Sequence, residues 1–355
     1  MSQFPQPIRL GEGDLYSPRV EAYLEEQAVL NRGVPEVEPQ PLIVRLIFSS
    51  YFYLSIASGL GAFVAWAIME PFFDDPPVEN PVWVGIFLFP LVAGFVGLFL
   101  GATEGIMCRN LQRAVVSAVV GFGIGFAGGL VVLIPAGVVY AIMEALAASL
   151  RKPDDVGPMP KGIALCVHMI GRSLAWSLAA VPAGLGQGIA LREKKVAMNG
   201  LLGGVLGGLI GGLLFDPIGL AFAGPNGQGD LSRCVGFTFI GLMVGLFVGL
   251  VEQWTKTAWL LMRAGPLAGK QFIIYRNPAV LGSSPKADIY LFKDEAIEPQ
   301  HALVHNFGGR YEIEDWNTAD GTYVNGIPVT KQILKPGDQI VLGKTVLEFA
   351  LKETS

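Results

Sequence analysis

Residues 201–216 read LLGGVLGGLIGGLLFD and are followed by Pro217. Glycine recurs at every fourth position, as Gly203, Gly207 and Gly211, and so lies on one face of a helix. In a soluble helix each glycine would cost about 1 kcal/mol relative to alanine, so the series is expected only where helix contact matters more than propensity. Small residues give such contact between helices in lipid. The stretch therefore predicts a membrane-spanning helix that packs through its glycines.

The same spacing of small residues occurs before two other prolines, and a second series with this spacing alternates with the first along the chain. The glycines that this spacing places at helix contacts are Gly61, Gly97, Gly101, Gly121, Gly125, Gly129, Gly184, Gly188, Gly203, Gly207, Gly211, Gly241, Gly245 and Gly249. The two series predict six spans arranged as three repeated hairpins. The expected spans, each near the ~20 residues that a bilayer core requires, are 46–70, 83–106, 114–135, 173–191, 197–216 and 234–255.

Composition also favours an integral membrane protein. The chain has 52% hydrophobic and only 15% charged residues, whereas soluble domains carry about 25% charged residues. No short cleavable signal precedes the first apolar run near Val44, so the first span is expected to remain in the mature protein. Basic residues in the short loops after spans two, four and six place those loops in the cytoplasm. We expect a bacterial inner-membrane protein with both termini cytoplasmic.

We expect three domains: a tail at 1–44, a six-span region at 45–265 and a second folded domain at 266–355. The tail contains one helix signal, which begins at Ser17-Pro18 and ends at Gly33. Residues 136–171 are expected to form a short amphipathic helix and a loop outside the spans.

The composition changes at Gly265-Pro266. From Lys270 onward, short β-type runs alternate with turn signals such as Asp320-Gly321 and Asn325-Gly326. Such pairs supply the positive φ angles that tight hairpins need. The pattern predicts an all-β sandwich of about 90 residues, so the fold class is an α-helical membrane bundle joined to a β-sandwich.

Three motifs in this region resemble those of the forkhead-associated (FHA) domain. Residues 281–289 (LGSSPKADI) resemble its glycine-initiated loop, residues 300–302 (QHA) its histidine motif, and residues 320–326 (DGTYVNG) its C-terminal half. The resemblance covers 267–351 and implies a β-sandwich that binds phosphothreonine peptides rather than an enzyme. It also implies architectural roles for Gly282, His301, Gly321 and Gly326.

The chain departs from the family at the positions that contact phosphate. The family usually has an arginine after the loop glycine, and this chain has Ser283. Where the family usually has a serine, three residues before the histidine, Glu298 would repel a phosphate of about −1.5 to −2 charge. Asp320 replaces the usual asparagine. We therefore expect binding of a cytoplasmic protein or phosphoprotein through a surface that comprises Ser283, Ser284, Glu298, Thr318, Asp320 and Asn325.

These features predict a membrane-anchored interaction scaffold or signalling adaptor. The alternative is a transport or channel subunit regulated by the β-domain, with Glu70, Glu104, Asp216 and Glu252 as candidate intramembrane acids. Glycine-lined faces also suit a homo-oligomer or a larger membrane complex. We expect no catalytic residue, cofactor or metal, because the three cysteines and three histidines are scattered. A net charge of −5 argues against nucleic acid as a partner.

Overall fold

The computed structural model describes residues 41–74, 81–155, 159–222 and 229–352. The chain divides into a helical unit, Pro41–Thr257, and a second unit that contains the β-strands from Ala258 onward. The helix expected between Ser17 and Gly33 lies outside the described residues.

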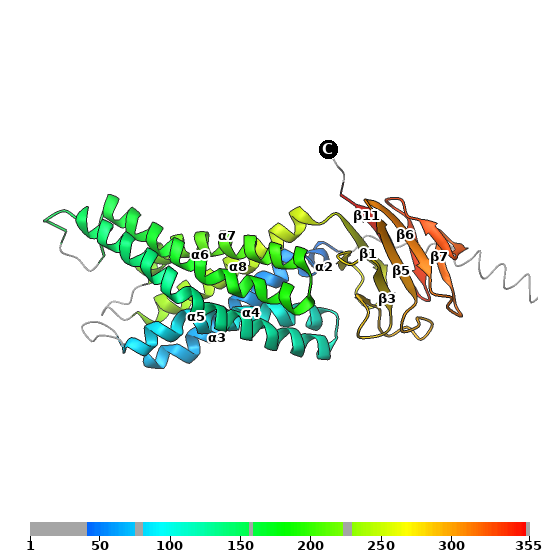
Figure 1. The fold of residues 1–355 in the computed structure, drawn as a ribbon, viewed down its shortest axis with the longest axis horizontal. Helices are drawn as coiled ribbons and strands as arrows, with labels where there is room; N and C mark the ends of the chain where they lie inside the picture. Colours follow the sequence, from blue (N-terminus) through cyan, green and yellow to red (C-terminus); the bar gives the residue numbers. More distant parts are fainter. Residues whose placement is uncertain (1–40, 75–80, 156–158, 223–228, 353–355) are drawn as a thin grey trace, which may run out of the picture. The chain divides into compact units, whose positions relative to one another are not determined.

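The described residues of the helical unit form six helices that are long and apolar enough to cross a membrane. Each packs against the next along the chain, and the last packs against the first, so the six form a closed ring. Figure 1 shows the helices side by side. The helices are α2 (Leu42–Ile47), α3 (Ser50–Met69), the 3₁₀ helix η2 (Glu70–Phe72), α4 (Val82–Met107), α5 (Leu111–Ser149), α6 (Ile163–Leu191), α7 (Lys194–Phe222) and α8 (Asp230–Thr255). The short α2 precedes the ring.

Of the three prolines expected to end a span, only Pro71 does so, since α3 ends at Met69 and the 3₁₀ helix η2 follows. α5 continues through Pro135, and α7 continues through Pro217. The residues after Pro135 include Ala, Met, Leu and Glu, which favour helix, and Ala136 and Ala147 are buried against neighbours. The expected separate helix and loop at 136–171 is therefore wrong: residues 136–149 extend α5, and α6 already begins at Ile163.

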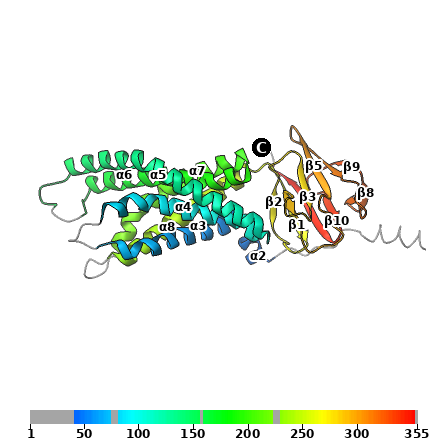
Figure 2. The same ribbon diagram turned by 60° about the horizontal axis from the view of Figure 1, so that its bottom comes forward.

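The β-unit is a sandwich of two sheets (Figure 2). One sheet has the order β2-β1-β11-β10-β7-β8 and the other β4-β3-β5-β6-β9. Side chains that alternate toward the interior, including Leu281, Val304, Ile313 and Leu347, form its buried core. The strands are β1 (Ala258–Ala264), β2 (Gln271–Ile273), β3 (Ala279–Gly282), β4 (Ile289–Tyr290), β5 (Ala302–Phe307), β6 (Arg310–Asp315), β7 (Thr322–Val324), β8 (Ile327–Val329), β9 (Lys331–Ile333), β10 (Gln339–Leu342) and β11 (Thr345–Leu351).

The sandwich begins at Ala258, before the boundary expected at residue 266. β1 pairs antiparallel with both β11 and β2, so it lies inside the six-stranded sheet. Gly265, with φ of +133°, lies in the turn between β1 and β2, where the backbone N–H of Gly269 donates to the carbonyl of Met262. The glycine and proline at 265–266 therefore mark a turn within the domain rather than its start.

Candidate functional site

His301 connects the loops at one end of the β-sandwich. Its side chain is fully buried, and its Nδ1 accepts a hydrogen bond from the backbone N–H of Glu298 at 3.2 Å. The opposite nitrogen, Nε2, therefore carries the proton, and this nitrogen lies 3.2 Å from the Gly321 carbonyl and 3.3 Å from the Thr318 hydroxyl. One imidazole thus links the loop before β5 to the loop between β6 and β7. The geometry is that of a structural histidine.

Asp315 holds the loop between β6 and β7. One of its carboxylate oxygens, Oδ1, accepts from the hydroxyls of Thr318 at 2.8 Å and Thr322 at 2.7 Å, while Oδ2 accepts from the Thr318 backbone N–H at 3.1 Å. Burial alone would raise the pKa of Asp315, but the hydrogen bonds from Thr322 and Thr318 outweigh it and hold the pKa below its ordinary value. The loop is therefore stabilised by an ionised carboxylate.

This carboxylate makes the stability of the β-unit depend on pH. Because the folded pKa is lower than the unfolded value of about 3.9, its contribution is complete above that value and is lost as the pH falls through the folded pKa. We expect Asp315→Asn to lower the unfolding free energy of the β-unit by about 1–3 kcal/mol at pH 7. The variant should also make this free energy depend less on pH in the acid range. Urea unfolding of fragment 258–355 between pH 3 and 7 measures both effects. Glu295→Gln, at an exposed carboxylate, is the control; equal acid dependence in wild type and Asp315→Asn would contradict the assignment.

Glu298 links two of the candidate loops directly. Its side-chain Oε1 accepts a hydrogen bond from the backbone N–H of Ala319 at 2.9 Å. Its backbone carbonyl accepts from the Ser283 N–H at 2.9 Å, and Ser284 N–H donates to the neighbouring Pro299 carbonyl at 3.2 Å. The expected surface residues Ser283, Ser284, Glu298 and Thr318 thus lie in loops that are hydrogen-bonded to one another.

Gly282 permits the close approach of these loops. A Cβ atom at this position would lie 2.7 Å from the carbonyl carbon of Pro299 and 2.9 Å from the carbonyl oxygen of Glu298. Gly321 and Gly326 have positive φ angles of 71° and 80°, which L side chains rarely adopt. The expected architectural glycines therefore have two different tasks, close contact in one loop and turn geometry in two others.

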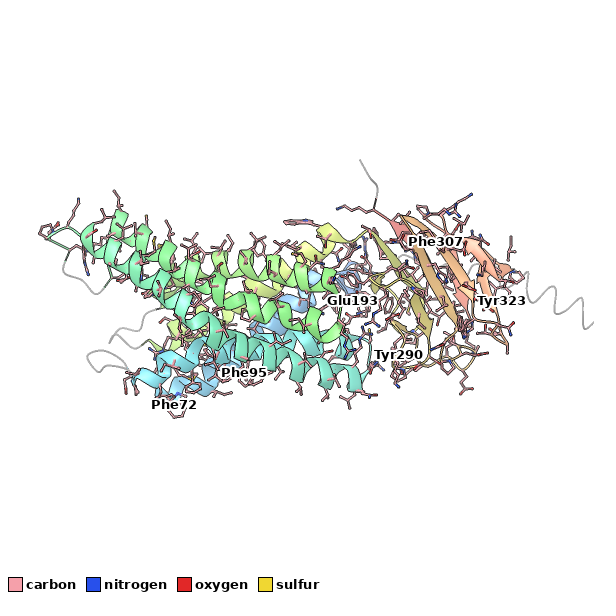
Figure 3. The ribbon with its side chains drawn as sticks, in the orientation of Figure 1. Phe72, Phe95, Glu193, Tyr290, Phe307 and Tyr323 are labelled. Atoms are coloured by element: carbon pink, nitrogen blue, oxygen red, sulfur yellow. The ribbon has the colours of Figure 1, made fainter. Side chains whose placement is uncertain are left out.

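Asn325 and Asp320 differ from the residues just described. The Asn325 side chain donates to Asp338 and accepts from the Gln339 N–H, both at 2.9 Å, so both of its ends are used within the domain. Asp320 is half-buried beside Gly321. Tyr323, which is labelled in Figure 3, follows in β7 and packs against Val341 and Val346. Asn325 thus holds the β7–β8 turn against β10.

The glycines singled out in the sequence lie at contacts between helices of the ring. A Cβ atom on Gly97 of α4 would lie 2.5 Å from the carbonyl oxygen of Gly121 on α5, and one on Gly121 would collide with the Gly97 carbonyl. At all fourteen positions the nearest atom to such a Cβ belongs to the backbone of another helix, within 2.9 Å. Gly123, by contrast, has no such neighbour within 4 Å. Phe95, which is labelled in Figure 3, makes an edge-on ring contact with Phe122 between α4 and α5, with ring centroids 5.3 Å apart.

The candidate acids of the helical unit have partners. Arg233 makes a bidentate ion pair with Glu70, in which Nε lies 3.1 Å from Oε2 and Nη2 contacts Oε1. Tyr53 donates to Glu104 at 3.5 Å. Asp216 lies 3.2 Å from Arg172 and belongs to a cluster with His168 and Glu144.

Sequence reasoning missed this cluster, although His168 and Arg172 are four residues apart on a helix, the spacing of facing side chains. Among the described residues, no group of three or more His, Cys, Asp or Glu side chains could hold a metal ion.

Comparison with known proteins identifies the β-unit. Residues 279–343 match the family model of the FHA domain. Over 93 residues, 26% of this chain, the sequence is 36% identical to an oxoglutarate dehydrogenase inhibitor from Corynebacterium jeikeium and 34% identical to the glycogen accumulation regulator GarA from Mycolicibacterium smegmatis. The chain spans less than two-thirds of these relatives, 64% and 58% of their lengths. A solved FHA domain from Chlamydia trachomatis is 25% identical and aligns with 28% of this chain and 100% of its own, with a TM-score of 0.26.

The matched residues comprise strands β3 to β10 and the loops that His301 connects. β1, β2 and β11 lie outside the match and complete the six-stranded sheet. Residues 279–343 of this chain therefore form an FHA domain, a module for binding other proteins.

Proposed function

We propose that this protein is a membrane-anchored scaffold whose FHA domain recruits a protein partner at the cytoplasmic face of a bacterial inner membrane. The proposal is supported by the six long apolar helices and by the low content of charged residues, 15%. The basic residues of the short loops favour a cytoplasmic FHA domain. Anchoring would raise the effective concentration of the partner at the membrane. The protein would then act by binding, without catalysis.

We further propose that recruitment does not require phosphothreonine. The observation that carries this proposal is the hydrogen bond from the Ala319 N–H to the Glu298 carboxylate. By the family resemblance, Glu298 stands where a serine usually contacts phosphate, so a carboxylate already fills that position and repels a second anion. Ser283 supplies no charge where the family usually has arginine. A neutral or basic segment of a partner suits this surface better than a phosphorylated one.

The relatives suggest a class of partner. One carries the name of an inhibitor of oxoglutarate dehydrogenase and another that of a regulator of glycogen accumulation. Their similarity to this chain is confined to about a quarter of its length. We propose a cytoplasmic enzyme or its regulator as the partner, held at the membrane by the FHA domain.

Peptide binding tests the independence from phosphate. Fragment 258–355 is titrated with a degenerate phosphothreonine peptide library and with its unphosphorylated twin. We expect the wild type to show no preference for phosphate. The double variant Ser283→Arg/Glu298→Ser should gain a preference of at least tenfold, about 1.4 kcal/mol, because a guanidinium replaces a neutral group and the repelling carboxylate is removed.

The matched control is Ser283→Arg/Glu295→Ser. It makes the same change in net charge but keeps the Glu298 carboxylate on Ala319, since Glu295 lies exposed in the same loop. This control should gain a smaller preference for phosphorylated peptides than Ser283→Arg/Glu298→Ser does. A wild-type domain that bound the phosphorylated library ten times more tightly than the twin would overturn the proposal.

A further inference from the structure

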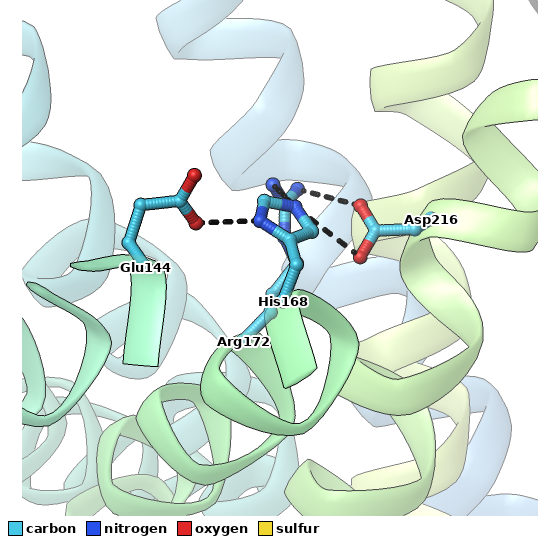
Figure 4. Close-up of polar contacts among 4 residues, drawn as sticks. All are labelled: Glu144, His168, Arg172 and Asp216. Carbon is cyan, nitrogen blue, oxygen red and sulfur yellow. Dashed lines mark hydrogen bonds and ion pairs between the residues drawn. The ribbon is translucent and has the colours of Figure 1, made fainter. Parts of the chain in front are cut away.

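A cluster of ionisable side chains lies inside the apolar helical unit, contributed by three consecutive helices. Glu144 comes from α5, His168 and Arg172 from α6, and Asp216 from α7 (Figure 4). The side chains of His168 and Asp216 are only 9% and 2% exposed, whereas that of Glu144 is 46% exposed. His168 lies between the two carboxylates, with Nδ1 2.6 Å from Glu144 Oε2 and Nε2 3.7 Å from Asp216 Oδ2.

The contacts of the two ring nitrogens indicate one tautomer of His168. Arg172 Nη2 lies 3.1 Å from His168 Nε2, and a guanidinium has donors only, so Nε2 must accept. The single ring proton is therefore on Nδ1 and is donated to Glu144. With the ring in this tautomer, the cluster contains two carboxylates but one guanidinium. Asp216 Oδ2 is buried and has no hydrogen-bond partner among the described residues.

We propose that His168 is a proton-binding site that joins α5 and α7 when it is occupied. A proton on Nε2 would cancel the excess negative charge of the cluster. It would also give Asp216 Oδ2 the hydrogen-bond donor that it lacks, after a small shift from 3.7 Å. The imidazolium would then donate to carboxylates on both sides. Glu144 is the most exposed side chain of the cluster, so a proton would reach the ring through its carboxylate.

Binding of the proton requires Arg172 to move. The ionisable groups around His168 are Tyr140 and Glu144 on α5, Arg172 on α6 and Asp216 on α7. Once Nε2 carries a proton, two donors face each other where Arg172 Nη2 now contacts the ring. A cavity of about 200 Å³ borders Arg172 and is otherwise lined mainly by apolar and aromatic side chains. It gives the guanidinium room to turn away while Nη1 keeps its contact with Asp216.

Histidine-selective NMR of the full chain in lipid nanodiscs tests this proposal directly. The chain has three histidines, and His168→Gln and His305→Gln assign their signals. We expect the Nδ1–H tautomer of His168 at pH 8 and an imidazolium by pH 5. A His168 ring that stays neutral throughout this range, or that carries its proton on Nε2 at pH 8, would overturn the proposal.

Substitution of the carboxylates shows whether the cluster controls proton binding. Asp216→Asn should lower the proton affinity of His168 about tenfold or more, because it removes the acceptor that the imidazolium would gain. Glu144→Gln should also lower the proton affinity of His168. Because Glu144 is partly exposed, its replacement should disturb folding less, so this variant provides the measurement if Asp216→Asn does not fold. Asp230→Asn, at an exposed position on α8, is the matched control and should leave the titration unchanged. Unchanged proton affinity in both cluster variants would reject the site.

Discussion

Fragment 266–355 will fail to fold, whereas fragment 258–355 will fold. The shorter fragment lacks β1, which pairs with β2 on one side and β11 on the other. It also lacks the buried side chains of Leu260 and Met262, each worth about 1.5–3 kcal/mol. Domains of this kind have a total stability of only about 5–15 kcal/mol, so the loss of these side chains together with two strand pairings removes most of it.

Circular dichroism and urea unfolding distinguish the two fragments. Fragment 258–355 should show one cooperative transition, and fragment 266–355 should show none and should aggregate, because the edges of β2 and β11 are left unpaired. Leu260→Ala in the longer fragment is an intermediate case that should cost about 2–5 kcal/mol. A cooperative transition of fragment 266–355 with the same midpoint as the longer fragment would contradict the assignment of β1 to this domain.

Gly121→Val will strongly destabilise the helical unit. The Cβ atom would collide with the Gly97 carbonyl on α4, and α6 closes the other side, since a Cβ on Gly186 would lie 2.9 Å from the Gly121 Cα. The helix cannot retreat without losing one of these contacts. Overpacking of this kind costs about 1–3 kcal/mol or more, and we expect about 3 kcal/mol here because valine adds three carbon atoms.

Gly123→Val is the matched control for this variant. Gly123 lies on the same helix, α5, and a Cβ atom at this position would meet open space. Because valine favours helix slightly more than glycine does, the control should be neutral or stabilised by a few tenths of a kcal/mol. Thermal unfolding of the purified full chain in detergent, followed by size-exclusion chromatography, gives the comparison. Equal melting temperatures for the two variants would contradict the packing role of Gly121.

Local sequence predicted the β-sandwich well because its turns are local structures. Gly321, Asn325 and Gly326 adopt positive φ angles within a few residues of one another, and each angle restricts the residue type at its own position. β1 was missed because its partner β11 lies at the other end of the domain. Its apolar residues follow α8 directly, and the turn signal at Gly265 comes only after the strand.

The helical unit shows the same division between local and distant information. The six apolar helices follow from composition and length, because apolar runs are a property of each segment alone. The continuation of α5 beyond Pro135 depends on residues that pack beside it, which the proline signal does not report. The cluster around His168 combines side chains from three helices, so spacing along the chain could reveal only the pair His168 and Arg172, not the carboxylates of Glu144 and Asp216.

The closed ring affects how the chain can be assembled during synthesis. α3 is made first among the six long helices, yet it packs against α8, which is made last. The backbone around Ser58 meets Gly241, and the carbonyl of Leu54 meets Gly245, only after α8 has been added. A nascent chain interrupted before α8 therefore exposes an unfinished seam on both α3 and α7. The ring is therefore complete only once α8 has been synthesised and has packed against both α3 and α7.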